Sequence, residues 1–177
     1  MPSGKTHDTI TLLLAVPTFA AAWGVTGSYL LAGVATGAML FGGLMFGPDL
    51  DILSRQYTRW GIFRVLWLPY RVVFSHRSRW SHGIILGTLV RVVYFAGVLA
   101  VIVAASIYLR ALFAAGGMPP AVADVLQAWR VIEAGISTYG VDRDVVWAVL
   151  AGLWWGAASH TLTDVGWSLM RKSTEIF

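Results

Sequence analysis

Hydrophobic residues fill long stretches of the chain, and polar segments separate them. The first stretch without a charged residue runs from Thr9 to Gly47, which is 39 consecutive positions. That length is about twice the ~20 residues that a helix needs to cross a bilayer core. The sequence Val-Thr-Gly-Ser at 25–28 interrupts it, so we predict two helices, about 9–25 and 29–47, that form a hairpin. The second helix carries glycines that permit close helix–helix contact, at positions 33, 37, 42, 43 and 47.

Two more hydrophobic stretches lie at about 84–113, where Arg91 is an early interruption, and at about 145–170. The segment 116–144 between them has apolar residues at helical spacing, which predicts an amphipathic helix on a membrane surface. Within the basic loop 49–82, the segment 60–74 mixes aromatic residues with arginines, which is typical of a helix lying among lipid headgroups. We therefore predict an all-α fold: a single polytopic membrane bundle of about four transmembrane helices with amphipathic interfacial helices.

The composition agrees with a membrane protein. Hydrophobic residues make up 57% of the chain and charged residues only 12%, whereas soluble domains average about 25% charged residues. The chain has no cysteine, which excludes disulfides, thiolate metal sites and iron–sulfur clusters. Its excess of basic residues is interpreted first as a topology signal, and nucleic acid is not an expected partner.

The charges are distributed unequally between the two predicted sides of the membrane. With four spans, both termini lie on the same side as the segment 49–82. That side holds nine cations: Lys5, Arg55, Arg59, Arg64, Arg71, Arg77, Arg79, Arg171 and Lys172. The other side holds Arg110, Arg130 and Arg143. The positive-inside rule therefore places the termini and the basic loop 49–82 in the cytoplasm, and the segment 116–144 outside.

The four histidines of the chain converge on this predicted cytoplasmic face. His7 directly precedes the first span, and His76 and His82 precede the third. His160 lies 15 residues into the last span, about 22 Å along a helix that starts outside. Four of the seven aspartates fall on the same face: Asp8, Asp49, Asp51 and Asp164.

Histidines and carboxylates on separate elements form the kind of pocket that binds a divalent metal. Neutral imidazole suits Zn²⁺ and other first-row metals, and carboxylates also accept Mn²⁺ or Fe²⁺. Eight candidate ligands are enough for one or two ions. Each residue alone has an ordinary interpretation, such as a helix cap or an interfacial polar group, and the arginines alone are typical topology determinants. Haem ligation is less consistent with the pattern, because every histidine segment also brings carboxylates or arginines.

Three short motifs also carry a family resemblance. They are Gly-Pro-Asp-Leu-Asp at 47–51, His-Arg-Ser-Arg-Trp-Ser-His at 76–82 and Ser-His-Thr-Leu-Thr-Asp at 159–164. Together they resemble the predicted membrane-bound metal-dependent hydrolases of the YdjM-like group. The spacing of the two histidines in the second motif is one residue longer than the tightest form in that group. The N-terminal sequence Pro-Ser-Gly-Lys-Thr-His-Asp is similar to a related group of metal-binding membrane proteins.

The resemblance implies a metal site and a set of roles. The implied ligands are His7, Asp49, Asp51, His82, His160 and Asp164, and His76 is a further ligand or an acid. The hydrolase label of the group derives partly from a likeness to zinc-dependent phospholipase C enzymes, which are all-helical. No glutamate is expected near the site, because Glu133 lies outside and Glu175 lies in the tail. A general base would therefore be an aspartate, Asp51 or Asp8.

The leading hypothesis is an integral inner-membrane hydrolase of a phosphoester or phospholipid, with a divalent metal at the cytoplasmic face. The metal would activate water, and Arg77 and Arg79 would bind the phosphate. The alternative is a non-catalytic protein in which the metal ties the spans together and the basic loop binds anionic lipid or a partner protein. A transporter is less consistent, because the first two spans offer no polar path. Self-association is left open.

Overall fold

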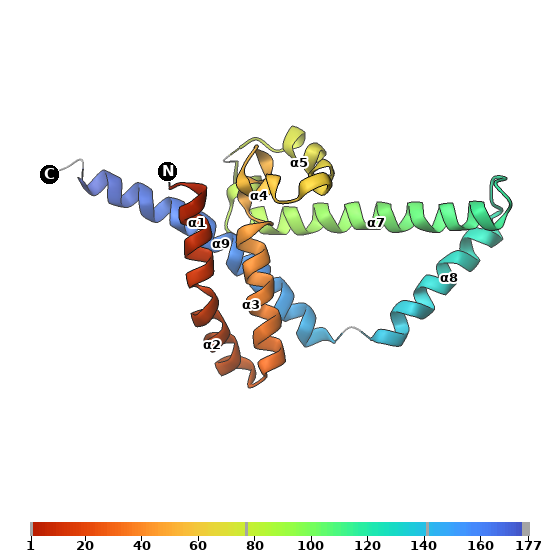
Figure 1. The fold of residues 1–177 in the computed structure, drawn as a ribbon, viewed down its shortest axis with the longest axis horizontal. Coiled ribbons are helices and arrows are strands. Elements are labelled where there is room, and N and C mark those ends of the chain that lie inside the picture. The colour runs from red at the N-terminus through yellow and green to blue at the C-terminus, as the bar shows by residue number, and fades with distance from the viewer. Residues whose placement is uncertain (1, 77, 141, 175–177) are drawn as a thin grey trace. The chain divides into compact units, whose positions relative to one another are not determined.

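The computed structural model describes residues 2–76, 78–140 and 142–174, and these residues form helices without any strand. The elements are shown in Figure 1. In chain order they are α1 (Gly4–Leu13), α2 (Ala15–Thr26), α3 (Tyr29–Leu44), the 3₁₀ helix η1 (Pro48–Asp51), α4 (Arg55–Thr58), the 3₁₀ helix η2 (Gly61–Trp67), α5 (Leu68–Val73), α6 (Arg79–His82), α7 (Leu86–Ala114), α8 (Val122–Tyr139) and α9 (Arg143–Thr174). The chain divides into two compact units, residues 1–92 with 143–177, and residues 93–142.

The first unit begins with the predicted helical hairpin. The first helix is broken at Leu14 into α1 and α2. Pro17 explains the break, because proline has no N–H to donate to the carbonyl four residues earlier and its ring crowds that carbonyl. The turn falls where the sequence predicts it. Gly27 adopts a left-handed conformation with φ of 63° and ends α2, and the Ser28 side chain caps α3 by accepting from the Leu31 N–H.

Helix α3 packs closely against α9, and glycines make this contact possible. A β-carbon at Gly42 would lie 2.6 Å from the carbonyl oxygen of Leu153. A β-carbon at Gly156 would collide with the carbonyl oxygen of Met39. The backbones therefore approach at distances that a larger residue would prevent. Among the glycines predicted for such contacts, Gly33 and Gly37 instead face open space. Small residues that meet in this contact include Ala35, Ala38, Gly42, Gly43, Gly152 and Gly156.

The polar segment after α3 is compact rather than one long interfacial helix. It forms the short elements η1, α4, η2, α5 and α6. Gly61, with φ of 55°, and Pro69 interrupt what would otherwise be a continuous helix. Trp67 and Tyr70 are fully buried, and the Trp67 ring packs edge-on against Phe46 at 5.4 Å. Aromatic burial therefore anchors this segment on the end of α3.

The second unit contains α7 from residue 93 onward and all of α8. Its small core consists of Ile107 and Ala111 on α7 and Ala128 on α8, with Val125 packed against them. Gly116 and Gly117 both have positive φ and form the turn that follows α7. The predicted amphipathic segment 116–144 thus contains a helix, and its position relative to a membrane stays a prediction.

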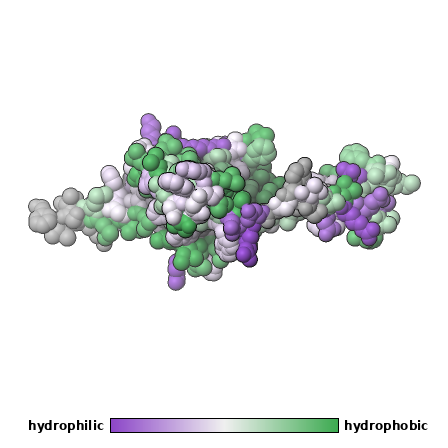
Figure 2. Space-filling model, turned by 90° about the horizontal axis from the view of Figure 1, so that it is seen from below, coloured by the Kyte–Doolittle hydropathy of each residue, from purple (hydrophilic) through white to green (hydrophobic). Residues whose placement is uncertain are grey.

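Three helical segments are long and apolar enough to cross a membrane: Gly4–Thr26, Leu86–Ala114 and Arg143–Arg171. Helix α3 is apolar but has only 16 residues, about 24 Å, which is less than the ~30 Å of a bilayer core. The count of four spans therefore stays a prediction. Large apolar side chains are exposed along these helices, and Val25 is 87% exposed. Figure 2 shows hydrophobic side chains over much of one face. This surface is consistent with membrane insertion.

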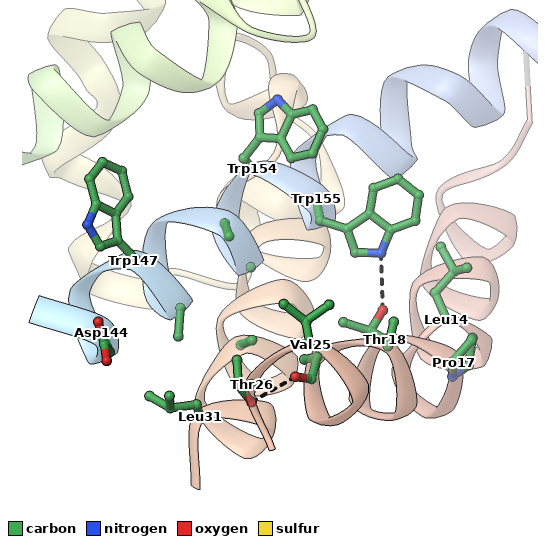
Figure 3. A pocket seen from close by; sticks show the side chains of 16 residues that line it. Leu14, Pro17, Thr18, Val25, Thr26, Leu31, Asp144, Trp147, Trp154 and Trp155 are labelled. Atoms are coloured by element: carbon green, nitrogen blue, oxygen red, sulfur yellow. Dashed lines mark hydrogen bonds between the residues drawn. The ribbon is translucent and has the colours of Figure 1, made fainter. Parts of the chain in front are cut away.

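An apolar pocket of about 800 Å³ lies between α2, α3 and α9 in the first unit (Figure 3). Leu14 and Trp155 lie at one end, and Val25, Leu31 and Asp144 also line it. The Trp155 indole N–H donates to the hydroxyl oxygen of Thr18 at 3.1 Å, and this hydrogen bond ties α9 to α2.

Candidate metal centre

Four separate elements of the first unit bring histidines and aspartates together. Helix α1 contributes His7 from its second turn, and α9 contributes His160 and Asp164, which are one helical turn apart. The 3₁₀ helix η1 contributes Asp49 and Asp51. The last residue of α6 is His82, and His76 lies in the loop before it. These side chains form two groups that can hold a metal ion, His7 with His160 and Asp164, and Asp49 with His76 and His82.

The first group is built between α1 and α9. The His7 Nε2 atom lies 3.3 Å from Asp164 Oδ1. The His7 and His160 rings are stacked, with their centroids 3.7 Å apart and their planes within 9°. Both histidines are buried. Thr11 on α1 packs directly against Gly43 on α3. Because position 43 has no β-carbon, α1 can lie close enough to α3 for this arrangement to form.

The second group lies between η1 and the segment 75–82. His76 Nδ1 lies 3.0 Å from Asp51 Oδ1, and His82 Nδ1 lies 3.6 Å from Asp51 Oδ2. The His76 and His82 rings meet edge to face at 4.8 Å. The Asp51 side chain is fully buried, whereas the His76 side chain is 32% exposed.

Asp49 connects the two groups. Its Oδ1 atom lies 3.3 Å from His82 Nε2, and its Oδ2 atom lies 3.3 Å from His160 Nε2. Burial on its own raises the pKa of the Asp49 carboxyl, but the attraction of the His160 and His82 rings outweighs it and holds the pKa well below its usual value. Asp49 is therefore a carboxylate at neutral pH and can act as a ligand without first losing a proton.

Several buried polar atoms at the centre of this cluster form no hydrogen bond. They are His7 Nδ1, Asp51 Oδ2, His82 Nε2, His160 Nε2 and Asp164 Oδ1. Leaving a buried polar atom without a partner costs about 1–3 kcal/mol. Four of these five atoms lie 3.3–3.6 Å from a histidine or aspartate side chain without forming a hydrogen bond, and His7 Nδ1 has no such contact among the described residues. A further group that binds these atoms would therefore stabilise the cluster. Imidazole nitrogens and carboxylate oxygens are the donors that first-row divalent metals use. The residues present therefore fit a metal ion.

Gln56 on α4 fixes the relation between η1 and α9. Its side-chain oxygen accepts from the Asp49 N–H at 3.1 Å, and its amide nitrogen donates to the carbonyl oxygen of Gly43 at 2.7 Å. The same nitrogen lies 3.2 Å from His160 Nδ1. Gln56 is buried, and one side chain thus links three elements around the centre.

A second polar network places His82. The Ser81 hydroxyl bonds to His82 Nδ1 at 3.1 Å and donates to the carbonyl oxygen of Ser75 at 3.1 Å. Arg91, buried in the first turns of α7, donates to the carbonyl oxygen of Ser81 and to the Thr88 hydroxyl. Helix α6, which ends at His82, is therefore fastened to the loop before it and to the start of α7.

The other residues predicted from the sequence lie outside the two groups. Both carboxylate oxygens of Asp8 pair with Arg59, and the Oδ1 contact measures 2.9 Å. The Oδ2 atom also pairs with Arg55 at 3.0 Å. Arg79 is exposed at the start of α6, and Arg77 lies outside the described residues. The structure adds three residues that the sequence pattern did not single out for the site: Arg55, Gln56 and Arg59. Arg55 and Arg59 are four residues apart and share a face, which is the one local signal that relates them.

The fold and the site together define a class, an all-helical protein with membrane-length apolar helices and a clustered histidine–aspartate site for metal. Within that class, the chain belongs to the family described as uncharacterized metal-binding protein (DUF2227), which matches residues 2–174. Comparison with curated proteins and with solved structures gives no match. The predicted membership of a metal-binding group is confirmed, and the likeness to YdjM-like hydrolases stays a prediction.

Proposed function

We propose that this protein is an integral membrane hydrolase that uses a two-ion divalent metal centre to cleave a phosphoester, at the cytoplasmic face of the membrane. The observation that carries the proposal is the bridging position of Asp49 between two groups of histidine and aspartate side chains. A carboxylate shared between two groups is typical of centres that hold a pair of ions and act on phosphate esters.

The residues that would hold the ions follow these two groups, except that Asp51 takes the place of His76 in the second. His7, His160 and Asp164 would hold one ion and His82 and Asp51 the other, with one Asp49 oxygen directed to each group. Zinc suits this set of donors best, and manganese or iron also suits it. When bound, a divalent ion lowers the pKa of its water and offsets negative charge on phosphate oxygens.

His76 is suited to proton transfer. Its side chain is 32% exposed, whereas those of His82, His7 and His160 are 13%, 7% and 3% exposed. Asp51 holds its Nδ1 atom at 3.0 Å, which orients the ring and leaves Nε2 to accept or donate a proton. Asp8 is engaged on both oxygens by arginines, so we assign it to positioning those arginines.

The apolar pocket supports a phospholipid as the substrate. Along the chain, Leu14 is seven residues beyond His7, and Trp155 is five residues before His160. At ~1.5 Å per residue, these distances are about 10 Å and 8 Å along the helices. An acyl chain in the pocket would therefore end within reach of the metal centre. The hydrocarbon lining matches such a chain.

The experiment that tests the proposal combines metal analysis with turnover. We expect the purified wild-type protein to retain two divalent ions, and His82→Ala and His160→Ala each to lose one of them, by elemental analysis. Asp124→Asn, which changes an aspartate on α8 in the second unit, is the matched control and keeps the metal. We also expect chelator-sensitive hydrolysis of a soluble phosphodiester or of phospholipid in vesicles.

The outcomes separate the alternatives. A wild-type protein without metal overturns the proposal. Retained metal with no turnover on either substrate, together with a large fall in thermal stability on chelation, instead favours the non-catalytic protein in which the metal ties α1, η1, α6 and α9 together.

A further inference from the structure

A small cavity, lined mostly by polar residues, opens directly onto the metal centre. It has a volume of about 270 Å³, and three of the proposed ligands line it: His7, Asp49 and His160. The rest of its lining comes from the start of α1 and from the segment around α4, namely Gly4, Asp8, Leu53, Ser54, Arg55 and Gln56. Pockets that enclose a whole drug-sized ligand measure about 300–1,000 Å³. This cavity is thus suited to one end of a substrate.

Arg55 lines this cavity, and some of its guanidinium N–H groups are not engaged in hydrogen bonds to described residues. Its Nη1 atom pairs with Asp8 Oδ2 at 3.0 Å, and within the described part of the chain its side chain has no other hydrogen-bond acceptor. Its position is fixed by the absence of a side chain at Gly4. A β-carbon there would lie 2.9 Å from Arg55 Cδ, so the aliphatic part of the arginine lies over the first turn of α1.

Arg59 explains why the charge of Arg55 is not cancelled by Asp8. Arg59 binds both Asp8 oxygens with its two terminal nitrogens, and Nη1 also donates to the carbonyl oxygen of Leu44 at 2.8 Å. The Asp8 carboxylate is therefore already paired with one guanidinium. Arg55 adds a second positive charge at this position, half exposed and next to the cavity.

We propose that Arg55 binds the phosphate group of the substrate in this cavity, beside the metal centre. The inference rests on the proposed function and names the side chain that selects an anionic substrate. A guanidinium offers planar paired donors that match phosphate oxygens, and Asp8 with Gly4 holds it in place. The sequence pattern assigned this role to Arg77 and Arg79, so the two assignments can be tested against each other.

The test measures binding of inorganic phosphate to the full-length, manganese-loaded protein, by calorimetry and by the broadening of the phosphorus NMR signal. We expect Arg55→Gln to weaken phosphate binding about 10- to 100-fold, because a charge-assisted hydrogen bond is lost. Arg55→Lys restores part of the affinity, since lysine keeps the charge without the paired donors. Metal content, measured on the same samples, stays at the wild-type value. Arg64→Gln is the matched control, because Arg64 is an exposed arginine outside the cavity lining.

Each result supports or overturns the inference. A loss confined to the Arg55 variants supports it. If Arg79→Gln weakens phosphate binding and Arg55→Gln does not, or if neither does while metal is retained, Arg55 is not the phosphate ligand. A wild-type protein without metal overturns the proposed function and this inference with it. Repeating the titration with a soluble phosphomonoester and with phosphatidic acid in nanodiscs shows whether the Arg55-dependent phosphate belongs to a free ester or to a lipid.

Discussion

Asp49 is the residue on which both halves of the proposed metal centre depend, because each of its oxygens faces a histidine of a different group. We expect Asp49→Ala to lose both ions, whereas His7→Ala loses one of the two, since His7 belongs to the first group alone. Metal stoichiometry by mass spectrometry under native conditions checks this. Equal losses in the two variants would contradict a bridging role for Asp49.

Gln56 acts on the centre without being one of the proposed ligands. It holds the Asp49 backbone and the His160 ring at the same time. Residues that hydrogen-bond to metal ligands commonly contribute about 10- to 100-fold to metal affinity. We therefore expect Gln56→Ala to weaken metal binding by that factor. Competition with a chromophoric chelator measures the change. The control is Gln127→Ala, which removes the other glutamine of the chain, exposed on α8, and leaves the affinity unchanged.

At the scale of the elements, the α3–α9 contact carries His160 and Asp164 to the other ligands. Position 156 has no room for a β-carbon, because the carbonyl of Met39 occupies that space. We expect Gly156→Ala to lower the free energy of unfolding by about 1–3 kcal/mol through overpacking. Thermal unfolding followed by circular dichroism measures it.

The same helix provides the matched control for that substitution. Gly166 has no neighbour that its β-carbon would meet. Gly166→Ala is therefore neutral or stabilises the protein by up to ~1 kcal/mol, because alanine has the higher helix propensity. A comparable destabilisation by both substitutions would contradict a specific role for the α3–α9 contact, because only position 156 lies in it.

At the scale of the whole molecule, the arrangement across a membrane is directly testable. The chain has no cysteine, so a single introduced cysteine is the only site of labelling. We expect Arg64→Cys, in the basic loop, and Met118→Cys, in the turn after α7, to react with an impermeant maleimide from opposite sides of oriented vesicles. The distribution of basic residues predicts that position 64 lies inside. Labelling of both from the same side would contradict the predicted sidedness.

Local sequence patterns predicted the long helices of this protein, but not the short elements η1, α4, η2, α5 and α6 of the basic segment. The apolar runs predicted the helices, Gly27 and Ser28 marked the hairpin turn, and the lack of charge over long stretches indicated membrane-length segments. These features depend on residues that are neighbours along the chain, so periodicity and composition reveal them. The residue types of the metal site were also visible, because histidines and aspartates are rare in apolar sequence.

The partners of those residues were decided by the tertiary structure alone. Gln56 meets His160 across 104 positions, and no local pattern relates them. The same holds for Asp49 between two histidines, and for Arg55 over Gly4 beside the cavity. Gly33 and Gly37 look like Gly42 and Gly43 in the sequence, yet only the latter pair lies in a helix contact. The sequence determined which chemical groups this protein has. The packing of α1, α3 and α9 determined which of them meet, because a side chain's neighbours depend on how distant helices dock.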